Sequence, residues 1–204
     1  MVKIILVRHG ETDWNKVRRI QGGDSDTPLN ETGRRQAEAL AARLKDEKIT
    51  AVFSSPLQRA LNTAQAIASY HSLEVKELSS LKEIKVGIME GRLASDLSLR
   101  FDEFMCGDGC EKKPHIPSGG ESVEDVQKRA WETITGLAAQ QPDSSLVIVT
   151  HYFVIMSVIC SVLNLPIHQM GRFRLSTGTI SAFTIDNGSP RLELFNDGCH
   201  NFKL

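Results

Sequence analysis

The sequence predicts an α/β fold, a three-layer sandwich in which helices cover both faces of a mostly parallel central sheet. Two observations favour it. Residues 4–7 and 146–149 are short, wholly aliphatic runs, which are typical of strands buried on both faces of a parallel sheet. Between such runs lie segments with apolar residues at helical spacing, and this alternation indicates the α/β class.

Length and composition agree with one domain over residues 1–204, because 204 residues with 41% hydrophobic content can bury a substantial core. The formal net charge of −1 gives no basic field for nucleic acid or an anionic membrane. No apolar run approaches the roughly 20 residues that span a bilayer, and no signal peptide is evident. We therefore expect a cytoplasmic protein whose four cysteines are reduced thiols.

In the first half of the chain, the strand at 4–7 leads into a polar loop over residues 10–30. A helix is predicted over 31–46, where apolar residues recur at i, i+3, i+4 and i+7. A second strand follows at 51–53. Ser55 is a good N-cap and Pro56 suits the first helical position, so the next helix is predicted to begin there. A third strand is predicted over 75–78.

Residues 92–117 are interpreted as a variable insertion that faces the substrate. Leu93, Leu97 and Phe101 could form a helical stripe within it. Cys106 and Cys110 with His115 lack the paired spacing of known structural zinc sites, so a metal site there is disfavoured.

The last part of the chain gives clearer signals. Ser122 and Asp125 form a capping box at the start of an amphipathic helix. Residues 153–164 are almost wholly apolar and predict a buried helix. Residues 179–186 and 191–196, separated by Asn187 and Gly188, predict a closing β-hairpin.

Two of the six histidines, His9 and His151, stand directly after buried strands. One such histidine would more often be structural, but two at equivalent strand ends favour a shared site at the rim of the sheet, where ligands bind in α/β proteins. Arg8 precedes His9, and Gly10 after it would let a ligand approach the backbone closely. This combination suits an oxyanion such as phosphate.

Residues 6–15, L-V-R-H-G-E-T-D-W-N, resemble the signature of the histidine phosphatase superfamily, in its compact, phosphoglycerate mutase-like phosphatase branch. Later segments add to the resemblance: S-S-P-L-Q-R at 54–59, L-K-E-I-K-V-G-I-M-E-G at 81–91 and G-G-E-S at 119–122. The resemblance covers most of the chain. It implies a phosphoglycerate mutase-like fold.

The resemblance also implies the site. His9 would be the nucleophile that forms a phosphohistidine, and Glu83 the acid that protonates the leaving oxygen. Phosphate would be held by the remaining residues, which are Arg8, Asn15, Gln21, Gly22, Arg59, His151 and Tyr152. Arg59 is also supported by its place in the first turn of a predicted helix, beside free backbone N–H groups. Tyr152 stands where many members carry glycine.

The leading expectation is therefore a metal-independent phosphomonoesterase of the histidine acid phosphatase type, without a cofactor, acting on a small-molecule phosphate ester. A homodimer is allowed. The alternatives are a cofactor-dependent phosphoglycerate mutase and an inactive phosphate-binding regulatory module. Mutases of the family carry a longer insertion than residues 92–118 and a shielding C-terminal tail, so hydrolysis is favoured. Phosphoserine, phosphoglycerate-type acids, sugar phosphates and ribazole phosphate all stay open as substrates.

Overall fold

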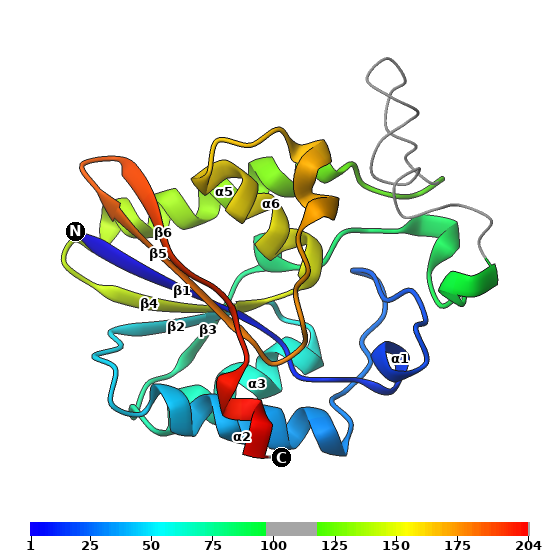
Figure 1. Cartoon of the computed structure of the whole chain (residues 1–204), viewed down its shortest axis with the longest axis horizontal. Helices are drawn as coiled ribbons and strands as arrows, with labels where there is room; N and C mark the ends of the chain where they lie inside the picture. Colours follow the sequence, from blue (N-terminus) through cyan, green and yellow to red (C-terminus); the bar gives the residue numbers. More distant parts are fainter. Residues whose placement is uncertain (97–117, 204) are drawn as a thin grey trace.

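A computed structural model of the chain describes residues 1–96 and 118–203 (Figure 1). Its centre is a six-stranded sheet in the order β3-β2-β4-β1-β5-β6. The strands are β1 (Val2–Arg8), β2 (Ala51–Ser54), β3 (Val75–Glu77), β4 (Ser145–Thr150), β5 (Ile180–Asp186) and β6 (Ser189–Asp197). The four strands β3, β2, β4 and β1 pair in parallel, whereas β5 and β6 are antiparallel. The predicted α/β class and mostly parallel sheet are confirmed.

Helices cover both faces of this sheet (Figure 1). On one face lie α2 (Glu31–Leu44) and α3 (Gln58–Ser69), and on the other lie α5 (Val123–Gln140) and α6 (Tyr152–Val162). A one-turn helix, α1 (Asp13–Lys16), lies in the loop after β1. Short 3-10 helices occupy Ser79–Leu81, Gly87–Met89, Ala94–Asp96, Ile167–Arg172 and Cys199–Lys203.

The strand sequences alternate between the two cores. In β1, Ile4 and Leu6 pack into the apolar cluster under α5 and α6, while Ile5 and Val7 pack into the cluster under α2 and α3. The central strand β4 alternates in the same way. Both faces of β1 and β4 are therefore covered by apolar side chains, which is why these two segments are continuous aliphatic runs.

The chain leaves β1 and β4 toward opposite faces of the sheet. These strands are parallel neighbours, with Arg8 aligned with Thr150. After β1 the chain continues into α1 and α2, whereas after β4 it continues directly into α6. Such a divergence opens a crevice at the carboxyl ends of the two strands, the usual place for a ligand in this class. Residues 9 and 151 are the first beyond those ends.

Most predicted elements are confirmed with shifted ends. The β5–β6 hairpin turns at Asn187 and Gly188, and the capping box of Ser122 and Asp125 begins α5. The helix predicted over 31–46 ends at Leu44. The short helix α1, capped by Thr12, was missed inside the predicted loop.

The predicted start of the helix after β2 is wrong by two residues. Leu57, not Ser55, is the N-cap of α3, and it makes no side-chain cap bond. The reason is that the Ser55 N–H still donates to the Val149 carbonyl at 3.0 Å, so the backbone of Ser55 extends the pairing of β2 with β4. The Ser55 hydroxyl accepts from the Leu57 N–H at 3.3 Å in the turn before the helix, and α3 begins after Leu57.

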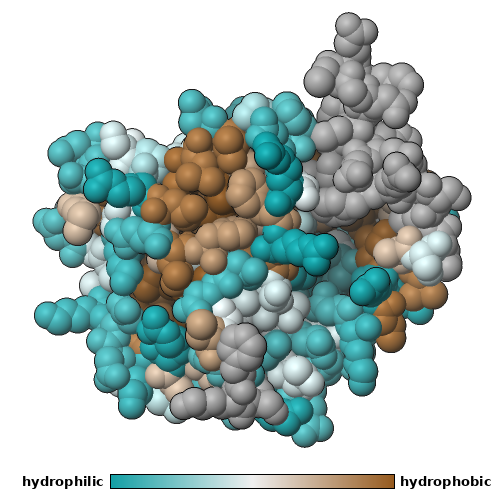
Figure 2. Space-filling model, viewed as in Figure 1, coloured by the Kyte–Doolittle hydropathy of each residue, from teal (hydrophilic) through white to brown (hydrophobic). Residues whose placement is uncertain are grey.

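The helical stripe through Leu97 and Phe101, and the cysteine–histidine group of Cys106, Cys110 and His115, lie outside the described residues. Within residues 1–96 and 118–203, no group of three or more His, Cys, Asp or Glu side chains could hold a metal ion. In the same part of the chain, no helix is long and apolar enough to cross a membrane. On the face seen in Figure 1, an apolar area lies over α6 and the β5–β6 hairpin (Figure 2), where Leu192 and Phe195 are half-buried against the core.

Replacing each of two helical glycines by alanine should change the stability of the fold in opposite directions. A Cβ on Gly33 in α2 would clash with the backbone of Glu11, whereas a Cβ on Gly136 in α5 would meet nothing within 4 Å. Gly136→Ala should therefore stabilise the fold by about 0.5–1 kcal/mol through helix propensity alone. Gly33→Ala should destabilise it despite the same gain. Urea denaturation of both variants checks this, and a stabilising Gly33→Ala would contradict the close packing of α2 on the loop after β1.

Candidate active site

The site is built around the two strand-end histidines. Because β1 and β4 are adjacent, the His9 N–H donates to the Thr150 carbonyl at 3.1 Å, and the ring centroids of His9 and His151 lie 5.1 Å apart. Both side chains are buried, with 3% and 0% exposure. The structure therefore brings together the pair that the sequence placed at equivalent strand ends.

The imidazole of His9 has a defined proton arrangement. Its Nδ1 lies 2.7 Å from the Gly10 carbonyl oxygen, which can only accept, so Nδ1 carries the hydrogen. Burial lowers the pKa of His9 well below its usual value, and the nearby Arg59 and Arg8 lower it further. The ring is therefore neutral at pH 7, with its lone pair on Nε2, which is the form that can attack phosphorus.

Gly10 is required by packing. A Cβ on Gly10 would clash with the carbonyl of Gly33 in α2. Its N–H donates to Thr63 Oγ1 at 3.2 Å, so the residue after His9 is anchored to α3. Close approach of a ligand to Gly10 stays a prediction.

Arg59 is a fully buried guanidinium held by backbone carbonyls. It donates from Nη1 to the Ser25 carbonyl at 2.8 Å and from Nη2 to the Gly22 carbonyl at 3.0 Å. Burial lowers the pKa of Arg59 to about 10, against the opposing effect of Glu83, so the group stays charged at neutral pH. Among the described residues its Nε has no hydrogen-bond partner, which leaves a donor for an anion.

Arg8 supplies a second guanidinium beside the histidines. Its Nη1 donates to the Leu175 carbonyl, and its Cζ lies 5.2 Å from the ring centroid of Tyr152. Tyr152 therefore supports Arg8 through a cation–π contact, a role that glycine at that position could not fill. Within the described chain the Arg8 Nε is also buried without a hydrogen-bond partner.

Glu83 meets the amino end of α6. The Phe153 N–H lies 3.2 Å from Oε1 and 3.4 Å from Oε2, and the Ile84 N–H donates to Oε1 at 2.9 Å. Burial raises the pKa of Glu83 in spite of these bonds and of the two arginines nearby. A carboxyl group held near the nucleophile with a raised pKa is suited to donating a proton.

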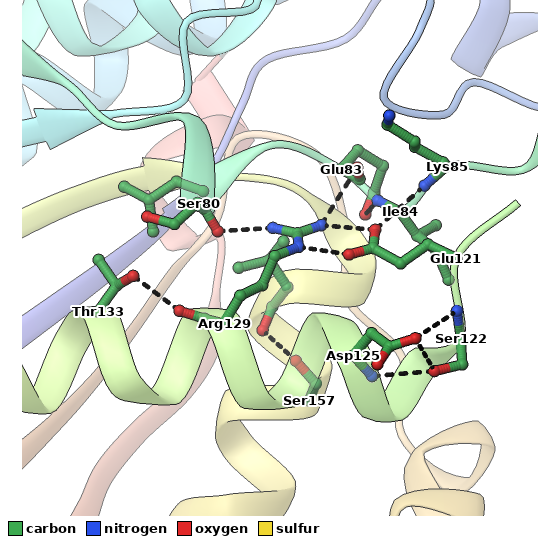
Figure 3. Close-up of polar contacts among 12 residues, drawn as sticks. Ser80, Glu83, Ile84, Lys85, Glu121, Ser122, Asp125, Arg129, Thr133 and Ser157 are labelled. Atoms are coloured by element: carbon green, nitrogen blue, oxygen red, sulfur yellow. Dashed lines mark hydrogen bonds and ion pairs between the residues drawn. The ribbon is translucent and has the colours of Figure 1, made fainter.

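The segment that carries Glu83 is fastened to α5 by Arg129 (Figure 3). Arg129 forms a two-pronged ion pair with Glu121 at 2.7 and 3.0 Å, and donates to the carbonyls of Ser80 at 2.6 Å and Glu83 at 3.4 Å. The Glu121 N–H donates to the Lys85 carbonyl at 2.9 Å. Both ends of the segment 80–85 are thus tied to the same ion pair.

Asn15 and Gln21 are joined by Thr12, which is fully buried. The Thr12 hydroxyl lies 3.0 Å from Asn15 Oδ1 and 2.9 Å from Gln21 Oε1. The hydroxyl has one proton and can donate to only one of these oxygens. Asn15 Oδ1 also accepts the Thr12 N–H at 3.1 Å, so the hydroxyl can donate to Gln21 Oε1, and both NH2 groups are left as donors. Within the described chain, the buried Gln21 Nε2 has no hydrogen-bond partner. These two predicted phosphate contacts have the polarity that an anion requires.

Gly22 contacts the site through its carbonyl, because its N–H is already hydrogen-bonded to Glu90. That N–H donates to Glu90 Oε1 at 2.7 Å, and the Gly22 carbonyl accepts from Arg59. A Cβ on Gly22 would come within 2.5 Å of Glu90 Oε2. The contribution of Gly22 to anion binding is therefore the placement of Arg59.

Sequence reasoning missed several supporting residues. Thr12 could have been found, because a threonine three residues before Asn15 is an N-cap pattern. Glu90 and Glu121 lie within the segments that carry the resemblance but were given no role. Arg129 carries no local signal, since it contacts Glu83 across 46 residues of sequence.

Known proteins resemble this chain over most of its length. Residues 4–198 match the model of the histidine phosphatase superfamily, branch 1. A probable phosphoglycerate mutase GpmB from Serratia proteamaculans is 36% identical over 183 residues, which is 89% of this chain and 84% of that protein.

Two solved structures share the fold. A phosphoserine phosphatase from Entamoeba histolytica in complex with 3-phosphoglyceric acid has a TM-score of 0.88 and 33% identity, covering 98% of this chain and 100% of that one. A mycobacterial glucosyl-3-phosphoglycerate phosphatase has a TM-score of 0.85 and 27% identity, covering 96% and 99%. With its paired strand-end histidines and buried arginines, the chain belongs to the histidine phosphatase superfamily.

Proposed function

We propose that the protein is a phosphatase that hydrolyses a small-molecule phosphomonoester through a phosphohistidine on His9. The observation that carries the proposal is the neutral His9 ring, with Nδ1 hydrogen-bonded to Gly10 and Nε2 unprotonated, beside the buried guanidinium of Arg59 and the half-buried Arg8. Phosphoryl transfer needs an in-line nucleophile and charge neutralisation of the equatorial oxygens. Both are supplied by side chains of this chain.

In the first step, His9 Nε2 attacks phosphorus and the bond from phosphorus to the ester oxygen breaks. Glu83 gives its proton to that oxygen, so the alcohol leaves neutral. In the second step, Glu83 takes a proton from water, and the water oxygen displaces His9 from phosphorus. Arg8 and Arg59 neutralise the phosphoryl oxygens throughout, assisted by His151 and the amides of Asn15 and Gln21. Orthophosphate leaves and both catalytic residues return to their starting states.

A second candidate, the cofactor-dependent phosphoglycerate mutase, is favoured by the names of several relatives, such as the Serratia protein. It would use the same phosphohistidine and pass the phosphoryl group to a phosphoglycerate instead of water. The similarity to two named phosphatases at TM-scores of 0.88 and 0.85 favours hydrolysis. The neutral His9 and the guanidiniums beside it support a phosphomonoester as the substrate.

A chase experiment separates the two candidates. Enzyme phosphorylated with a labelled aryl phosphate is mixed with excess 3-phosphoglycerate, and the products are separated. We expect the label in inorganic phosphate, because Glu83 can activate water against the phosphohistidine. Label that moves mainly into bisphosphoglycerate would show that the mutase assignment is right and the hydrolase assignment wrong.

His9→Ala should abolish both turnover and the acid-labile phosphoenzyme, because the nucleophile is removed. His151→Ala should slow phosphoenzyme formation by roughly 100-fold, the usual cost of one donor to a developing oxyanion, without changing the attachment site. Rapid quench followed by mass spectrometry at alkaline pH maps the phosphate. His71→Ala, after the end of α3, is the matched control and should retain activity. Phosphate on His151 would overturn the assignment.

Glu83→Gln should slow phosphoenzyme formation strongly with alkyl phosphates, by roughly 100-fold or more, because an alkoxide needs a proton to leave. The loss should be much smaller with p-nitrophenyl phosphate, whose phenolate leaves unprotonated. Stopped-flow bursts with both substrates measure the difference. Glu74→Gln, an exposed glutamate, is the control.

The pH profile of that first step tests the same residue. The proton donor must be protonated, so the rate falls as pH rises through the pKa of Glu83. Burial raises this pKa. With alkyl phosphates, the rate should therefore fall at a pH above the usual pKa range of a carboxyl group. Glu83→Gln should no longer show this fall. If the rate of Glu83→Gln still fell at the same pH, another residue would be the proton donor.

A further inference from the structure

Ser55 lies directly against the second histidine of the site. Its Oγ is 2.8 Å from His151 Nε2, and both side chains are fully buried. The contact follows from the sheet, because the Ser55 N–H donates to the Val149 carbonyl and so aligns the end of β2 with the end of β4. Sequence reasoning placed Ser55 only at a helix cap.

The direction of this hydrogen bond is inferred from the other partner of Ser55. The Leu57 N–H, which can only donate, points to Ser55 Oγ at 3.3 Å. Within the described residues, His151 Nε2 is the only group left near the hydroxyl that can accept its proton. The hydroxyl therefore donates to Nε2, and the neutral ring carries its own hydrogen on Nδ1.

The remaining nitrogen of His151 is poised as a donor. Its Nδ1 is buried and, among the described residues, has no hydrogen-bond partner. Burial and the positive charge of Arg59 lower the pKa of His151 well below its usual value, so the ring is neutral and only one nitrogen can donate. If the tautomer were reversed, Nδ1 would present a lone pair and repel a phosphoryl oxygen.

We propose that Ser55 is a positioning residue that fixes His151 in the Nδ1–H tautomer, so that Nδ1 donates a hydrogen bond to the phosphoryl group as it is transferred to His9. The inference rests on the proposed phosphoryl transfer and deepens it. The two neutral imidazoles, 5.1 Å apart, then have opposite polarity toward the phosphoryl group. His9 offers a lone pair because Gly10 holds its Nδ1–H, and His151 offers an N–H because Ser55 holds its Nε2.

The tautomer is tested first on the unmodified protein. In long-range ¹H–¹⁵N spectra of the ¹⁵N-histidine-labelled enzyme at neutral pH, His151 should show a protonated, pyrrole-type Nδ1 and an unprotonated, pyridine-type Nε2. Resonances are assigned by their loss in His151→Ala. A pyrrole-type Nε2 on His151 would overturn the proposal, whatever the variants do.

Kinetics test the consequence. Ser55→Ala should slow phosphoenzyme formation by roughly 10-fold or more, since loss of a fixed donor to the oxyanion weakens the transition state. It should also shift the His151 ¹⁵N signals toward a tautomer mixture. Ser55→Cys keeps a weak donor of similar size, so its rate of phosphoenzyme formation should lie between those of Ser55→Ala and the unmodified protein. Ser54→Ala is the matched control: Ser54 is equally buried, but its hydroxyl donates to the Ser55 carbonyl at 2.8 Å and not to a histidine.

A double-mutant cycle separates positioning from folding. In a His151→Ala background, Ser55→Ala should have little further effect on the rate, because its only route to the phosphoryl group is gone. An equal loss in both backgrounds would show that Ser55 acts elsewhere and would overturn the inference.

The same cycle distinguishes this inference from the proposed function. If His9→Ala retains the phosphoenzyme, the proposed function fails. If His9→Ala and His151→Ala behave as expected and Ser55→Ala equals Ser54→Ala, the phosphatase mechanism stands and only the role of Ser55 is wrong.

Discussion

The parallel pairing of β1 with β4 is the constraint on which the rest of the site depends. It aligns Arg8 with Thr150, so His9 and His151 emerge side by side. Because the chain then departs toward opposite faces of the sheet, the two connections diverge, which is how a ligand crevice forms at the carboxyl ends of strands in this class. The glutamate, the second arginine and the serine all reach this crevice from other elements, each held by a backbone contact with the same strand ends or with the loops that leave them.

Burial gives chemically different residues their separate roles. Removing water disfavours charge, so it lowers the pKa of both histidines and raises that of Glu83. The histidines become neutral bases or donors, and the carboxyl becomes a better proton donor. Arg59 keeps its charge because its ordinary pKa is so high that the lowered value of about 10 still exceeds neutral pH. Burial therefore leaves the two histidines neutral and makes Glu83 easier to protonate, without removing the charge of Arg59.

The backbone does much of the positioning around these side chains. Carbonyls of Ser25 and Gly22 hold Arg59, the Gly10 carbonyl holds His9, and the Phe153 N–H of α6 meets Glu83. Such partners are placed by the fold and change little with side-chain identity. Other positioning runs through side chains, as in the ion pair of Arg129 with Glu121, which fixes the segment of Glu83 to α5 (Figure 3).

The sequence by itself determined the α/β class, the order of most elements and the family, because aliphatic runs, helical spacing and the R-H-G-E-T segment are local signals. It also placed His9 and His151 at equivalent strand ends, and their ring centroids lie 5.1 Å apart. Only the tertiary structure decided how they meet. Gly10 packs against α2, Gly22 places Arg59, and Ser55, just beyond β2, contacts His151 instead of capping a helix. The physical reason is that such contacts join residues far apart in the chain, so no pattern along the sequence records the direction of a hydrogen bond, the tautomer it sets or the pKa that burial shifts.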